Sequence, residues 1–263
     1  QIFPTGNAFA ALKEDGSVIT WGWSDYGGDS SSVSAELQSG VSQISSTKLA
    51  FAALKEDGSV ITWGSSGGVP SSVADQLQSG VVQIFSNGLA FAALKEDGSV
   101  ITWGAQGGDS SSVSSQLQSG VSQIFVNYAS FAALKEDGSV ITWGIGDGGV
   151  DSSGVIRLHQ AGGGDSSSVS SQLQSGVSQI FSNRDSFVAL KEDGTVITWG
   201  NTNHGVDISS VSSQLQSGVS QIFSNRNAFA ALKEDGSVIT WGDPNNGGDS
   251  SSVSAQLQSG VAQ

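Results

Sequence analysis

The residues that could perform chemistry are few in this chain of 263 residues, which has two histidines, His159 and His204, and no cysteine. A nucleophilic triad needs a histidine beside its nucleophile, and a nucleophile elbow is absent from the sequence. The glycine-rich GGDSSS segments lack the lysine and the following helix of a phosphate-binding loop. We therefore expect no enzymatic activity and no cofactor.

Acidic pairs such as Glu14-Asp15 and Glu56-Asp57 recur six times and offer the oxygen ligands that Ca²⁺ prefers. Each pair lies in the phrase KEDG, directly after a lysine, and none has the spacing of a calcium-binding loop. We expect a solvated charged rim and no metal site.

Arginine, tryptophan and tyrosine supply many of the energetically important contacts in protein interfaces, so their positions are informative. Six of the ten Lys and Arg residues belong to the repeated KEDG phrase, and the other four are Lys48, Arg157, Arg184 and Arg226. Outside the repeated pattern the chain also has Trp23, Tyr26 and Tyr128. These residues are the first candidates for a binding surface.

The sequence contains a repeat, and the candidate residues take their places from it. The string SVITWG, once TVITWG, occurs six times and places Trp-Gly at spacings of 42, 40, 40, 56 and 42 residues. A fixed period of this length indicates a repeat architecture. The six tryptophans, Trp21, Trp63, Trp103, Trp143, Trp199 and Trp241, occupy one invariant place in the repeat, and we expect them to pack between repeats.

Each repeat contains three predicted strands. The segments VSQIF, FAAL and SVITW are rich in β-branched and aromatic residues, and the KEDG between the last two is a hairpin signal. The later segment SSVSSQLQ fits either a helical turn or an irregular return strand, because Val and Leu lie four residues apart. We expect the irregular return.

The two ends of the chain are complementary. Residues 259–263, SGVAQ, begin the pattern of the first strand, and the opening QIF continues it. Joining them would seal the ring and remove the terminal faces that an open solenoid leaves exposed. We expect an all-β fold, a closed six-bladed β-propeller with short three-stranded blades and an irregular return segment, in one domain over 1–263.

The phrase ALKEDGSVITWG, preceded by SGVSQIFSN, resembles the repeats of the regulator of chromosome condensation family of β-propellers. The short repeats are most similar to those of its bacterial beta-lactamase inhibitory protein type two branch. The resemblance covers essentially the whole chain and implies a propeller, although that family usually has seven blades and this chain has six copies. Inhibition of a beta-lactamase would need several aromatic residues between the first two strands, and a chromatin role would need a basic tail. We expect neither.

Two segments of the repeat differ among its copies. The first loop joins the first and second strands, and the second loop follows Trp-Gly; if the strands alternate in direction, both loops lie at one end of the blades. No two first loops agree, whereas KEDG at the other end never changes. The variable pairs of the first loop are Gly6-Asn7, Lys48-Leu49, Gly88-Leu89, Tyr128-Ala129, Arg184-Asp185 and Arg226-Asn227.

The fourth repeat has an insertion of about 16 residues, at about 145–164, with the apolar and basic core GVIRLHQ between glycines. It is either a docking element or a mobile loop. With the insertion and both loops, the predicted partner-binding residues are Trp23, Tyr26, Lys48, Leu49, Leu89, Tyr128, Arg157, His159, Arg184, Asp185, His204, Arg226 and Asn227.

The composition excludes several partners. A formal net charge of −14 opposes nucleic acid and anionic lipid, and no apolar run approaches the length of a membrane span. We therefore expect a non-enzymatic scaffold that binds another protein. A structural or self-assembling subunit and a carbohydrate-binding propeller are the alternatives. The start at Gln1 is compatible with a processed secreted chain or with a piece of a longer one, so no compartment is predicted.

Overall fold

The computed structural model describes residues 1–65, 71–105, 107–145, 163–201 and 206–262. The chain divides into two compact units, Gln1–Ile124 and Phe125–Gln263, and each unit is described by itself. Among the described residues, no helix is long and apolar enough to cross a membrane. The expectation of one domain over 1–263 stays a prediction.

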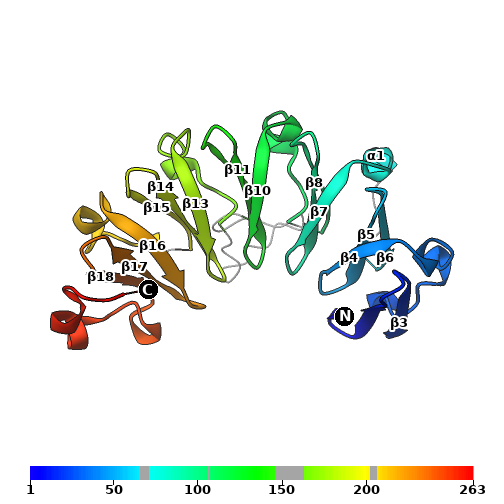
Figure 1. Ribbon diagram of the computed structural model, residues 1–263, viewed down its shortest axis with the longest axis horizontal. Coiled ribbons are helices and arrows are strands. Elements are labelled where there is room, and N and C mark those ends of the chain that lie inside the picture. Colours follow the sequence, from blue (N-terminus) through cyan, green and yellow to red (C-terminus); the bar gives the residue numbers. More distant parts are fainter. Residues whose placement is uncertain (66–70, 106, 146–162, 202–205, 263) are drawn as a thin grey trace, which may run out of the picture. The chain divides into compact units, whose positions relative to one another are not determined.

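Six three-stranded antiparallel sheets follow one another along the chain (Figure 1), each built from three consecutive strands in sequence order. The fold is that of an all-β propeller with six blades, as the repeat predicts. The strands of the first three blades are β1 (Ile2–Pro4), β2 (Ala8–Leu12), β3 (Val18–Gly22), β4 (Val41–Ser46), β5 (Ala50–Lys55), β6 (Val60–Gly64), β7 (Val81–Ser86), β8 (Ala90–Lys95) and β9 (Val100–Gly104).

The last three blades repeat this pattern. In the first unit β1 contacts β4 and β4 contacts β7, and in the second unit β13 contacts β16, so the first strands of successive blades are neighbours. The strands are β10 (Val121–Val126), β11 (Ser130–Lys135), β12 (Val140–Gly144), β13 (Val177–Ser182), β14 (Ser186–Lys191), β15 (Val196–Gly200), β16 (Val219–Ser224), β17 (Ala228–Lys233) and β18 (Val238–Gly242).

The return segments are helical, so the expected irregular return strand is wrong and the helical-turn alternative is right. Their leucines point into the core, and Leu37, Leu77 and Leu215 are almost fully buried. The short helices are α1 (Ser71–Ala74) and the 3-10 helices η2 (Ser31–Val33), η3 (Glu36–Gln38), η4 (Asp75–Leu77), η5 (Ser111–Val113), η6 (Gln116–Gln118), η7 (Ser167–Val169), η9 (Ser212–Leu215) and η11 (Ser251–Leu257); η1 (Ser24–Tyr26) and η10 (Pro244–Asn246) lie in the second loops.

The core lies between successive blades, because alternate residues of each strand point to opposite faces of its sheet. In the first unit, Ala8, Ala10 and Val18 pack against Phe51, Ala53, Ile61 and Trp63 of the next blade. Small side chains on one face of a blade therefore pack against large side chains on the facing side of the next blade. The same arrangement joins Val188, Leu190 and Val196 to Phe229, Ala231, Ile239 and Trp241 in the second unit.

The first and last blades differ from this pattern. Phe9 and Trp21 stack on each other with ring centroids 5.4 Å apart, as in every blade, yet they are 42% and 44% exposed. Phe223 on β16 is 47% exposed. No blade of the same unit covers these three rings, so the expectation that Trp21 packs between repeats stays a prediction. The sealing of the ring through one shared strand stays a prediction.

Candidate functional site

The two variable loops of each blade are hydrogen-bonded to each other. In the first blade the Trp23 N–H donates to the Asn7 carbonyl over 2.9 Å, and in the second the Ser65 N–H donates to the Leu49 carbonyl over 3.1 Å. Equivalent bonds link Ala105 to Leu89, Ile145 to Ala129, Asn201 to Asp185 and Asp243 to Asn227. Both variable segments therefore lie at one end of each blade, as predicted, and we call this end the loop end.

A Thr or Asn side chain anchors each first loop, and it is buried in the second to fifth blades. The Asn183 Oδ1 accepts hydrogen bonds from the backbone N–H groups of Asp185 and Ser186, over 3.0 and 2.8 Å. The same pair of bonds is accepted by Thr47, Asn87, Asn127 and Asn225, and Thr5 accepts a bond from the Ala8 N–H. Sequence reasoning missed this anchor, although its signal, a Thr or Asn before each variable pair, is present in the sequence.

In the first unit the first loops of successive blades form a continuous row. The Gly6 N–H donates to the Lys48 carbonyl over 2.8 Å, and the Lys48 N–H donates to the Gly88 carbonyl over 3.2 Å. Lys48 is exposed between two glycines, and the neighbouring predicted residues Leu49 and Leu89 are half-buried.

Trp23 and Tyr26 stand beside this row in the second loop of the first blade. Their rings stack with centroids 5.3 Å apart, and Trp23 is 60% exposed. A Cβ atom at Gly6 would lie only 3.3 Å from the Tyr26 ring. Glycine at position 6 therefore leaves room for the Tyr26 ring beside the first loop. The structure brings Trp23, Tyr26 and Lys48 together.

In the second unit the corresponding row carries larger side chains. The Tyr128 N–H donates to the Arg184 carbonyl over 3.0 Å, and the Arg184 N–H donates to the Arg226 carbonyl over 3.4 Å. The Arg184 guanidinium carbon lies 5.3 Å from the centroid of the Tyr128 ring, a cation–π contact. We call Tyr128, Arg184 and Arg226 the arginine row.

The remaining predicted residues surround the arginine row or lie outside the described residues. Asp185 is buried, with its Oδ1 3.8 Å from the Arg184 Nε, and Asn227 is half-buried beside Arg226. The predicted residues Arg157, His159 and His204, with most of the insertion, fall outside the described residues.

The opposite end of each blade, the turn end, is uniform. The Asp57 Oδ1 accepts from the Ser59 hydroxyl and backbone N–H, over 2.6 and 3.0 Å, and these hydrogen bonds lower the pKa of Asp57. The same bonds lower the pKa of Asp15, Asp97, Asp137, Asp193 and Asp235. The KEDG aspartates are therefore engaged in closing their own turns, and no group of three potential metal ligands occurs among the described residues.

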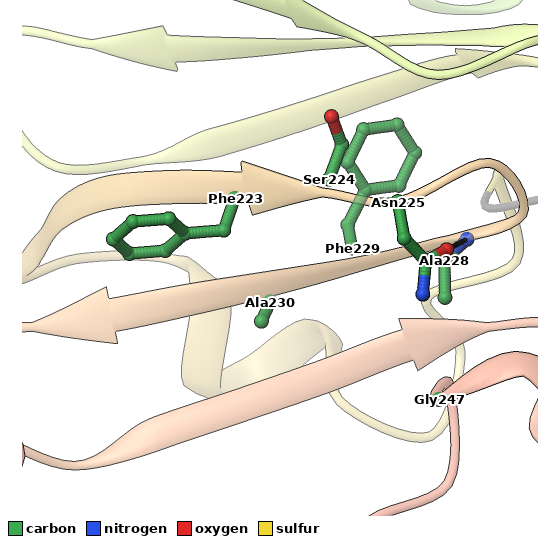
Figure 2. Close-up of a pocket in the computed structure, with 7 residues that line it drawn as sticks. All are labelled: Phe223, Ser224, Asn225, Ala228, Phe229, Ala230 and Gly247. Atoms are coloured by element: carbon green, nitrogen blue, oxygen red, sulfur yellow. Dashed lines mark hydrogen bonds between the residues drawn. The ribbon is translucent and has the colours of Figure 1, made fainter.

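A pocket of about 220 Å³ opens on the flank of the last blade (Figure 2), lined by Phe223, Asn225, Phe229 and Gly247 among others. On the fourth blade the fifth blade fills the equivalent place: a Cβ atom at Gly163 would meet the Phe187 ring at 2.5 Å, and the Trp199 indole N–H donates to the Gly163 carbonyl. A Cβ atom at Gly247 would have only the Asn225 side chain within 4 Å, at 3.4 Å. The pocket thus corresponds to the place where, between other blades, aromatic side chains of the following blade pack. We assign it no ligand.

Comparison with known proteins gives similarity of structure alone. No protein-family model matches the chain, and no curated protein matches it. Among solved structures, the chain is similar to Prp20p from Saccharomyces cerevisiae, described with its binding to Gsp1p and histones, at 16% identity over 92% of this chain and 71% of that one, with a TM-score of 0.47.

Two further solved structures are similar over 92% of this chain. Yeast RCC1 (Prp20) bound to Kap60 has 17% identity, a TM-score of 0.48 and 69% of its chain covered. The ectodomain of the receptor kinase CR4 from Physcomitrella patens has 14% identity, a TM-score of 0.48 and 62% of its chain covered. Yeast RCC1 belongs to the family that the repeat resembles.

Proposed function

We propose that the protein is a non-enzymatic scaffold that recognises a partner protein through the loop end of its blades. The observation that carries this proposal is the contrast between an invariant frame and six different first loops that the frame presents in the same way. Each variable pair follows a Thr or Asn anchor, so substitution changes the surface without changing the loop conformation.

The residue types at the loop end support a protein partner. Trp23, Tyr26 and Tyr128 provide aromatic surface, and Arg184 and Arg226 provide planar donors; such residues are enriched where interfaces gain most of their binding energy. The hydrogen-bonded loops lose little conformational freedom on binding, which favours affinity.

The alternatives gain less support from the same residues. A carbohydrate-binding propeller with one site per pair of blades needs equivalent residues in each blade, whereas the six first loops all differ. Self-assembly through the uniform turn end or the blade flanks stays a prediction.

The test exploits two blades that already have glycine at the first variable position, Gly6 and Gly88. A variant with Lys48→Gly, Tyr128→Gly, Arg184→Gly and Arg226→Gly gives the other four first loops glycine at this position too. The immobilised protein is incubated with lysate of the cells that produce it, and captured proteins are quantified by mass spectrometry. We expect the variant to lose the specific partner by tenfold or more.

The control removes the same number of positive charges from the turn end, through Lys55→Gln, Lys191→Gln and Lys233→Gln. We expect this variant to capture the partner as the unmodified protein does, and circular dichroism checks that both variants are folded. Equal capture by the glycine variant and the unmodified protein would show that the loop end is not the binding surface.

A further inference from the structure

The arginine row concentrates positive charge on an acidic protein. Arg184 and Arg226 are exposed and adjacent, joined through the backbone hydrogen bond of their loops. Within the described residues, the one ion pair found for either arginine is Arg184 with Asp185, whose Nε and Oδ1 atoms are 3.8 Å apart, longer than a hydrogen bond. The two guanidiniums thus keep a net positive charge after Asp185 is counted.

Tyr128 orients the first of these arginines. The Arg184 guanidinium carbon lies over the Tyr128 ring, 5.3 Å from its centroid. A guanidinium in such a contact retains the N–H groups along its edge, and these can bind an oxyanion through two parallel hydrogen bonds. The Arg184 side chain is therefore placed to bind a carboxylate from outside the protein.

The backbone beneath the row is fixed on both sides. The Asn183 Oδ1 holds the N–H groups of Asp185 and Ser186, and the Asn225 Oδ1 holds those of Asn227 and Ala228 over 2.9 and 2.8 Å. The Asn225 Nδ2 also donates to the Asn246 carbonyl over 2.7 Å. The spacing of the two arginines is set before any partner arrives.

We propose that the arginine row binds an extended acidic segment of the partner protein, with carboxylates on alternate residues; this inference rests on the proposed function and specifies its partner. Loops joined by backbone hydrogen bonds lie about 5 Å apart, and alternate residues of an extended chain lie about 6.6 Å apart. Arginine side chains are long enough to span that difference. Each guanidinium then pairs with one carboxylate, and Tyr128 presents its ring to the side chain beside them.

The experiment measures binding of short fluorescent peptides to the folded protein by anisotropy. The probes are a repeating Glu-Ala peptide, the matched Gln-Ala peptide and a phosphoserine-Ala peptide. We expect the Glu-Ala peptide to bind, with affinity falling as salt is raised because the row is exposed. The Gln-Ala peptide should not bind, and phosphoserine should not bind tenfold more tightly than glutamate.

Variants test which residues are responsible. Arg184→Gln with Arg226→Gln should weaken binding of the Glu-Ala peptide by tenfold or more, because both charge-assisted hydrogen bonds are lost. Tyr128→Leu should weaken it by about two- to fivefold, the range of an exposed cation–π contact. The control, Lys191→Gln with Lys233→Gln, removes two charges at the turn end of the same unit and should leave affinity within twofold.

Three outcomes would overturn the inference: no binding of the Glu-Ala peptide, equal loss in the arginine and lysine variants, or tenfold tighter binding of the phosphoserine peptide. Its failure is distinguishable from failure of the proposed function. If the acidic peptide does not bind but the glycine variant still loses its protein partner, the loop end remains the binding surface and only the acidic segment is excluded.

Discussion

The loop end and the turn end of the blades use similar hydrogen bonds for opposite purposes. At the turn end the side chain of Asp57 accepts from Ser59 and closes a hairpin whose sequence is the same in all blades. At the loop end Asn183 accepts from Asp185 and Ser186, yet the residues it positions differ in each blade. The anchors and turns therefore specify the frame, and the variable pairs can differ without changing it.

The largest expected effect comes from breaking the packing between blades. Trp199 is 1% exposed, and its indole N–H donates to the Gly163 carbonyl, so Trp199→Ala should lower the free energy of unfolding by about 3–5 kcal/mol. Trp21 holds the same place in the repeat but is 44% exposed. Trp21→Ala should cost about 1 kcal/mol, near the centre of the range for point mutants.

Denaturant unfolding of the two variants measures this contrast. Equal destabilisation would show that a blade outside the first unit covers Trp21, as closure of the ring requires.

A smaller effect is expected at the glycines of the turn end. Gly58 has a φ of +77°, and a Cβ atom there would lie 2.8 Å from the Gly80 nitrogen. Gly58→Ala combines the left-handed conformation with a backbone clash and should cost about 2–4 kcal/mol. Gly260 has a φ of +80° with nothing within 4 Å, so Gly260→Ala should cost about 1–2 kcal/mol.

Thermal unfolding of both alanine variants provides the measurement. A Gly58→Ala protein no less stable than the Gly260→Ala protein would show that the turn yields to the added methyl group.

A smaller loss of stability is expected at acid pH, through the KEDG turns. Hydrogen bonds from Ser59 hold the folded pKa of Asp57 below its ordinary value of 3.8, as equivalent bonds do in the other KEDG turns. A group with a lowered folded pKa stabilises the fold above its unfolded pKa, and that contribution is lost as pH falls through the folded pKa. Stability should therefore decline as the pH falls below about 3.8.

Nuclear magnetic resonance titration of the Asp57 carboxyl, beside thermal unfolding at each pH, measures this effect. A carboxyl midpoint at or above 3.8 would contradict the role of the serine hydrogen bonds.

The smallest effect on stability is expected at the loop end. Arg184 and Arg226 are exposed, so Arg184→Gln with Arg226→Gln should change the free energy of unfolding by less than about 0.5 kcal/mol per residue. Chemical denaturation measures it. A larger loss would give the arginine row a structural role and would weaken the contrast between the two ends.

Much of the fold follows from the sequence because the repeat is regular. The strand alternation in FAAL and VITW predicts the sheets, and KEDG predicts each hairpin. The helical return segments were not predicted, since Val and Leu four residues apart fit two conformations and the burial of Leu37 decides between them. The exposure of Phe9, Trp21 and Phe223 depends on what lies beside each blade, which a repeat pattern does not contain.

The candidate site was predicted in part. The variable loops identified Tyr128, Arg184 and Arg226 individually, and strand direction placed them at one end. Their adjacency follows from hydrogen bonds between loops 42 or 56 residues apart in the chain, and the stacking of Arg184 on Tyr128 depends on side-chain conformation. Neither is visible in local sequence.

The most direct test of the account is hydrogen exchange of the protein with and without its captured partner. The account predicts that the partner slows exchange at the first loops, including residues 127–130, 183–186 and 225–228, and at the second loop 23–28. Exchange at the turns 13–17, 55–59 and 191–195 should stay unchanged. Protection of the turns with unchanged loops would contradict the claim that the variable end of the blades is the binding surface.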